Sequence, residues 1–115
     1  EKIGPLLSKA RALVMSSLHP EPFALVLPEA LESGLPVAVV KTALLAEEIV
    51  AAGLGVSFDM YDSASADAAL IRIRDASADE IRKMSIAGHS KTPCLANTVQ
   101  QWTDGLVSLY ESVVP

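Results

Sequence analysis

Short apolar runs alternate with helix-like segments along this chain, and this alternation constrains the fold more than any other feature. The runs at residues 12–16, 36–40 and 55–58 are four or five residues long and largely apolar, as is typical of strands buried on both faces, and the second is rich in valine. Strands that alternate with helices predict a parallel sheet with helices on its faces. We therefore expect an α/β fold: a three-layer α/β/α Rossmann-like arrangement with a small parallel sheet and a helical C-terminal tail.

The predicted helices carry recognisable start and stop signals. Helices are expected over residues 4–11, 23–33, 43–53, 65–76, 77–91 and 95–114. Gly34 and Gly53 stand where helix-ending glycines belong, and Ser77 and Glu80 have the spacing of a capping box. Pro28 removes a backbone hydrogen bond unless it lies in the first turn, so the second helix should begin near residue 24 or 25.

The final predicted helix, over residues 95–114, is amphipathic. Its large apolar residues recur at helical spacing, which predicts that they pack into the core. These residues are Trp102, Leu106, Leu109 and Tyr110.

Composition excludes several classes of function. The 115 residues fit one domain, and 14 acidic against 9 basic residues give a net charge of −5, which argues against nucleic-acid binding. A metal site is not expected, because Cys94 is alone and His19 and His89 have no ligand spacing. No apolar run is long enough to span a bilayer and no signal peptide is visible, so a cytoplasmic setting is expected. The chain starts without methionine inside a predicted helix, which indicates a fragment of a larger protein.

Two glutamates, Glu21 and Glu29, flank the predicted start of the second helix. The loop before this helix follows a strand, and in open α/β sheets ligands bind beyond the carboxyl ends of strands. Free N–H groups near Ala24, Leu25 and Val26, with the positive end of the helix dipole, would attract phosphate. Eight helical residues rise by about 12 Å, so carboxylates at both ends suit the hydroxyls of a nucleotide-sugar. The alternative from spacing alone is that both are surface acids.

The stretch "ARALVMSSLHPEPFALVLPEALESGLPVAVV" resembles the C-terminal half of family-four retaining glycosyltransferases of the GT-B fold. That family carries a Glu-x7-Glu signature in a context like "PS..EPFG...LEA...G.PV". The matching residues are Ser17, Glu21, Pro22, Phe23, Glu29, Ala30, Gly34, Pro36 and Val37. The resemblance continues more loosely through "EEIVAAGLGVSFD", and it covers most of the chain.

The resemblance implies a role for each matching residue. Glu21 would lie by the transferred sugar as the catalytic residue, and Glu29 would bind the ribose of the nucleotide. Backbone amides of Phe23, Ala24 and Leu25 would approach the sugar and the diphosphate. His19 is a further candidate for contacting the sugar, and the alternative is an exposed loop histidine.

The resemblance also implies the context of the site. Residues 1–115 would form the C-terminal part of a nucleotide-sugar-binding domain, whose partners are a nucleotide-sugar donor, an unidentified acceptor and an N-terminal Rossmann-like domain outside this chain. No cofactor or obligatory metal is implied, and peripheral membrane association of the parent protein stays open. The chain alone should be inactive.

Two departures from the family pattern keep a second hypothesis open. Ala24 stands where the family usually has glycine, and it would be strained if the position needs a positive φ. Residues 42–48, "TALLAEE", replace a glycine-rich turn, although Glu47 matches an acid of that turn. The alternative function is a non-catalytic nucleotide-sugar-binding or interaction domain with a degenerate site. A third alternative is an unrelated flavodoxin-like α/β domain.

Overall fold

The parallel sheet predicted from the sequence is present in the computed structural model, which describes residues 7–19, 24–95 and 97–114, without the side chains of 92–95. Strands β1 (Leu13–Met15), β2 (Val37–Val40) and β3 (Gly55–Phe58) pair in the order β1-β2-β3. The described helices are α2 (Val26–Glu32), α3 (Ala46–Ala51), α4 (Ser63–Asp75), α5 (Ala78–Leu95) and α6 (Val99–Val113). This confirms the α/β fold class.

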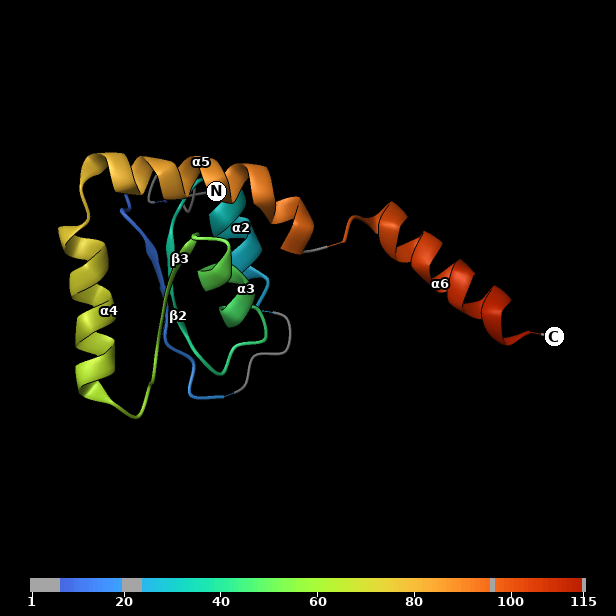
Figure 1. The fold of residues 1–115 in the computed structure, drawn as a ribbon, viewed down its shortest axis with the longest axis horizontal. Helices are drawn as coiled ribbons and strands as arrows, with labels where there is room; N and C mark the ends of the chain where they lie inside the picture. The colour runs from blue at the N-terminus through green and yellow to red at the C-terminus, as the bar shows by residue number, and fades with distance from the viewer. Residues whose placement is uncertain (1–6, 20–23, 96, 115) are drawn as a thin grey trace.

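The sheet forms the middle of three layers. Figure 1 shows α4 on one face of the sheet and α2 with α3 on the other, while α5 crosses the end at which the strands begin. All four residues of β2 are buried, because both neighbouring strands and both helical layers cover it. Leu27 and Leu31 from α2 and Ile49 from α3 complete the core on one face. Burial of this apolar surface is the main stabilising term of the fold.

The expectation that every strand is covered on both faces is correct for β2 and wrong for β1. Val14, in the middle of β1, is 48% exposed, and Ser57 in β3 is exposed as well. Both strands lie at the edges of the described three-stranded sheet, where one neighbouring strand is missing. An apolar run therefore indicated a strand but did not distinguish the centre of the sheet from its edge.

Most predicted helix signals are confirmed. Gly34 and Gly53 follow α2 and α3 with φ of 79° and 71°, a conformation that favours glycine. The Ser77 N–H donates to the Glu80 carboxylate (2.8 Å) and the Glu80 N–H donates to the Ser77 hydroxyl (3.2 Å), which completes the capping box. Pro28 lies in the first turn of α2, which begins at Val26, one residue later than expected.

Several predicted helix boundaries are wrong: α5 ends at Leu95 rather than 91 and α6 begins at Val99 rather than 95, and three others differ as well. The helix expected over 4–11 ends at Leu7 in the described part, where the Ala10 N–H closes a turn on the Leu7 carbonyl (3.0 Å). Helix α3 starts at Ala46 rather than residue 43. Helix α4 starts at Ser63 because the Asp62 carboxylate accepts a hydrogen bond from the Ala64 N–H (3.0 Å) and so caps the helix earlier than expected.

The predicted core packing of the last helix is also wrong. No residue of α6 is buried, and Trp102 and Tyr110 are 59% and 65% exposed. Figure 1 shows α6 apart from the three layers. The helix is nevertheless well formed locally, since Thr98 and Gln101 make a complete capping box. Helical periodicity predicted the helix but not the surface against which it would pack.

Candidate functional site

The carboxyl ends of the strands gather the loops that carry the candidate site. The segments that follow β1, β2 and β3 all leave the sheet at the end opposite α5 (Figure 1). In open parallel sheets this end is where ligands bind. The structure therefore places the start of α2, the turn at residues 41–45 and the turn at residues 59–62 on one end of the molecule.

The backbone at the start of α2 has an unusual conformation. Ala24 has φ of +29°, in the left-handed region that L-residues rarely adopt. Among the described residues other than glycine, no other has a positive φ. The expectation that alanine would be strained here if φ were positive is therefore met. The N–H groups of Ala24, Leu25 and Val26 make no hydrogen bond to another described residue, whereas the Leu27 N–H donates to the Ala24 carbonyl (2.8 Å).

The structure places three of the other candidate side chains at the surface. Glu29 is exposed in the first turn of α2, and Leu25, the N-cap residue, is 68% exposed. His19 is exposed in the loop after β1, where its N–H donates to the Ser17 hydroxyl (3.3 Å) and its carbonyl accepts from that hydroxyl (3.1 Å). Glu21 and Phe23 lie outside the described residues, so their predicted roles stay predictions.

Sequence reasoning missed an ion pair beside this site. Lys41 Nζ lies 2.7 Å from Asp59 Oδ2. The strand register explains the pair, because Val40 and Phe58 are partners at the ends of adjacent parallel strands and the next residue of each strand is therefore a neighbour. The sequence alone does not give this register. The hydrogen bond from Lys41, with another from the Tyr61 N–H, lowers the pKa of Asp59 below its ordinary value.

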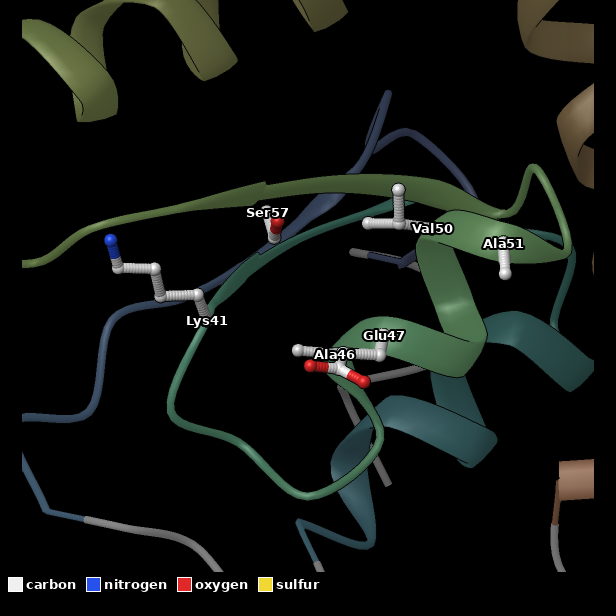
Figure 2. A pocket seen from close by; sticks show the side chains of 6 residues that line it. All are labelled: Lys41, Ala46, Glu47, Val50, Ala51 and Ser57. Atoms are coloured by element: carbon white, nitrogen blue, oxygen red, sulfur yellow. The ribbon is translucent and has the colours of Figure 1, made fainter.

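A hollow of about 440 Å³ opens next to this ion pair. It is lined by Lys41, Ser57 and residues of α3, including Glu47, the acid that matches the family turn. Figure 2 shows the Lys41 side chain pointing away from Glu47. Lys41 is therefore the basic residue placed near the candidate site, while Lys9 and Arg11 lie at the opposite end of the sheet, before β1. Neither of those two can reach a diphosphate at the start of α2.

Two kinds of site are missing from the part of the chain that the structure describes. Its His, Cys, Asp and Glu side chains form no group of three or more that could hold a metal ion. Among the described helices, none combines the length and apolar character needed to cross a bilayer.

Comparison with known proteins assigns the chain to a family. A family model described as Glycosyl transferases group 1 matches residues 1–90. The match includes the whole sheet, helices α2 to α4 and most of α5, together with the loop that contains Glu21. Neither the curated proteins nor the solved structures gave a match. A family model that covers most of a 115-residue chain establishes membership, and the chain belongs to the group 1 glycosyltransferases.

Proposed function

We propose that this chain supplies the donor site of a retaining glycosyltransferase of the GT-B fold, which transfers a sugar from a nucleotide-sugar to an acceptor. Membership in the group 1 family supports glycosyl transfer in general. It also removes the unrelated flavodoxin-like domain from the alternatives. The donor, the retention of configuration and the roles of individual residues belong to the proposal.

The observation that carries the proposal is the backbone of Ala24. A left-handed φ in a residue other than glycine costs on the order of 1–3 kcal/mol and persists only where the surrounding structure imposes it. Here it occurs at the position where the resembling family usually has glycine, at the carboxyl end of the sheet and one residue before the α2 N-cap. A glycine-like φ kept at this position although the glycine is lost supports the proposed donor site. A decayed site would be under no such constraint.

The neighbouring groups fit the three parts of a nucleotide-sugar. Glu29, exposed in the first turn of α2, offers carboxylate oxygens to the ribose hydroxyls. The N–H groups of Ala24, Leu25 and Val26 offer donors to the diphosphate. Glu21 takes the place beside the transferred sugar in this proposal.

These groups would act on the reaction by positioning and by electrostatics. Fixed N–H donors stabilise the negative charge that develops on the leaving diphosphate, and they do so without reorganising. Binding of the ribose and the sugar holds the anomeric carbon in place for the acceptor. The acceptor-binding groups would come from a second Rossmann-like domain, so this chain alone is expected to bind the donor without turnover.

Calorimetric titration of the protein with UDP-, GDP- and ADP-sugars tests the proposal. We expect one of them to bind and Glu29→Ala to weaken it by roughly 10- to 100-fold, because a hydrogen bond to a charged group contributes about 1.5–3 kcal/mol. Glu32→Ala is the matched control, since Glu32 is exposed on the same helix one turn later. Equal losses in the two variants, or no binding of any nucleotide-sugar, would contradict the proposal.

The second candidate function is a domain that binds nucleotide-sugars but does not catalyse. The methyl group of Ala24 and the altered turn at residues 42–48 favour it, because both lie where the backbone would approach the donor. Substituting Ala24→Gly distinguishes the two functions. In an active transferase the glycine should leave turnover by the complete protein unchanged or raise it, whereas a protein with no turnover in either form would be the binding domain.

A further inference from the structure

A second hollow lies at the opposite end of the sheet, where the strands begin. It is an open hollow with a volume of about 460 Å³, bordered by the residues before β1, the turn between α2 and β2 and the first turns of α5. This volume is in the range of pockets that hold small molecules. The candidate donor site is at the other end of the strands, so this hollow is a separate feature.

The charge of this hollow is opposite to that of the chain. Lys9, Arg11 and Arg82 line it, and no Asp or Glu is among its described lining residues. The chain as a whole has 14 acidic and 9 basic residues, and three of the nine basic residues are among the described lining residues of this hollow. A positive patch in an acidic protein raises the local concentration of anions.

The nearby acids are largely occupied elsewhere. Glu80 accepts hydrogen bonds from Arg72 (3.0 Å) and from the Ser77 N–H (2.8 Å). Asp75 accepts a hydrogen bond from Arg74 (2.6 Å) and also interacts electrostatically with Arg11. Asp79 is exposed in the first turn of α5 but does not line the hollow. Among the described residues, Lys9 and Arg82 make no ion pair, and both line the hollow.

The walls of the hollow are fixed in place. Arg11 donates through Nε to the Ile73 carbonyl (3.1 Å) and through a terminal nitrogen to the Ala76 carbonyl, which ties the segment before β1 to the end of α4. On the other side, Gly34 lies against Ser85, whose hydroxyl oxygen would be 2.7 Å from a Cβ at that position. The Ser85 hydroxyl thus adds a hydrogen-bond donor to a rigid, cationic lining.

We propose that this basic hollow, formed by Lys9, Arg11, Arg82 and Ser85, binds a phosphate group carried by a small molecule or by a lipid. Two cations without an ion pair among the described residues, a fixed guanidinium and a hydroxyl are donors that suit a tetrahedral oxyanion. The apolar floor, which includes Leu35 and Ile81, can contact a short carbon group attached to the phosphate. The site is distinct from the donor site and would serve binding or regulation.

Amide chemical-shift titration of the full chain with inorganic pyrophosphate tests the site. We expect saturable shifts at residues 9–11, 34 and 78–85, and a dissociation constant raised at least about tenfold in Arg82→Gln, since a charge-assisted bond contributes more than 1.4 kcal/mol. Lys83→Gln is the matched control: Lys83 is exposed, adjacent in sequence and outside the lining, and the substitution removes the same charge. It should change the constant less than about twofold.

Vesicles of phosphatidylglycerol, with phosphatidylcholine vesicles as the neutral reference, form the second arm of the experiment. Arg82-dependent binding of pyrophosphate supports a free phosphate compound, and Arg82-dependent binding to the anionic vesicles alone supports a lipid headgroup. Absence of Arg82-dependent binding in both arms overturns the proposal, as do equal losses in Arg82→Gln and Lys83→Gln. Pyrophosphate that shifts the amides of Ala24, Leu25 and Val26, and not those of residues 9–11, 34 and 78–85, would lie at the donor site and would also overturn the proposal.

Discussion

Helices α5 and α6 begin in the same way and end up in opposite environments. Each starts with a reciprocal capping box, Ser77 with Glu80 in α5 and Thr98 with Gln101 in α6. Yet α5 packs along α2, while α6 buries none of its residues. A capping box satisfies the free N–H groups of one turn and needs only neighbouring residues, whereas packing needs a complementary surface elsewhere. The start of a helix can therefore be predicted from neighbouring residues in the sequence, but the surface on which the helix packs cannot.

The contact of α5 with α2 depends on small and polar side chains. Gly88 is buried against the backbone of Leu31, so close that a Cβ there would lie 3.0 Å from the Leu31 carbonyl oxygen. His89 Nδ1 lies 3.0 Å from the Glu32 carbonyl oxygen, and Lys91 donates to the Ala52 carbonyl (3.0 Å). Both carbonyls lie at or just beyond helix C-termini, where cations and donors are favourable. Helix α6, in contrast, presents large apolar side chains to solvent.

The largest expected difference between the two regions comes from truncating a large side chain. Leu31→Ala, in the fully buried contact of α2, should lower the free energy of unfolding by about 2–5 kcal/mol, because it removes buried surface and leaves a cavity. Trp102→Ala in α6 should change it by less than about 0.5 kcal/mol. Urea denaturation followed by circular dichroism measures both. A large loss in Trp102→Ala would show that α6 packs on the domain.

A matched pair of glycines gives the next largest difference. Gly88→Val should lower the free energy of unfolding by about 1–3 kcal/mol, because the added atoms are forced against the backbone of α2. Gly105→Val in α6 has no atom within 4 Å of the new Cβ and should be close to neutral. Thermal and urea unfolding of the two variants provide the comparison. Equal effects would contradict the close contact of α5 with α2.

The two capping boxes should stabilise their own helices by similar amounts, but only the box of α5 should stabilise the whole domain. Ser77→Ala and Thr98→Ala should each weaken their helix by about 0.5–2 kcal/mol. Only Ser77→Ala should shift the urea midpoint, since α5 is coupled to the core by packing and α6 is not. Amide hydrogen exchange should detect the Thr98→Ala loss within α6 alone. A shift of the urea midpoint in Thr98→Ala would contradict this prediction, because it would show that α6 unfolds together with the domain.

The smallest expected difference between the two helices is in how the stability contributed by their capping boxes changes as the pH falls. Hydrogen bonds from the Ser77 N–H, the Ser77 hydroxyl and Arg72 lower the pKa of Glu80 below its ordinary value of 4.5, whereas Gln101 in the other box does not titrate. Because the pKa of Glu80 is lower in the folded state, its carboxylate stabilises the fold at pH values above 4.5. This stabilisation is lost as the pH falls through the pKa of the folded state. The difference in unfolding free energy between the wild type and Glu80→Gln should therefore shrink below pH 4.5. A constant difference down to low pH would exclude this role.

The fold could be predicted wherever a signal was local. The valines of β2, the glycines at 34 and 53 and the Ser77–Glu80 spacing each fix their own backbone, and each is confirmed. Errors arose where distant partners decide the outcome. The exposure of Val14 depends on the position of β1 in the sheet, and that of Trp102 depends on whether any surface covers α6.

The candidate site could be predicted only in part for the same reason. Because the resembling family usually has glycine at position 24, we expected strain at Ala24 if its φ were positive. The structure shows a positive φ there. Two other features could not be predicted, because they bring together residues that are far apart in sequence. They are the Lys41–Asp59 ion pair, which depends on strand register, and the three cations at the other end of the sheet.

Amide chemical-shift mapping with uridine, guanosine and adenosine diphosphates tests the central claim most directly. If this chain supplies the donor site, one nucleotide should shift the amides of Ala24, Leu25, Val26 and Glu29 saturably, and Glu29→Ala should weaken that binding while Glu32→Ala does not. The account is contradicted if all three nucleotides leave the start of α2 unchanged, or if they shift only the residues of the basic hollow at the other end of the sheet.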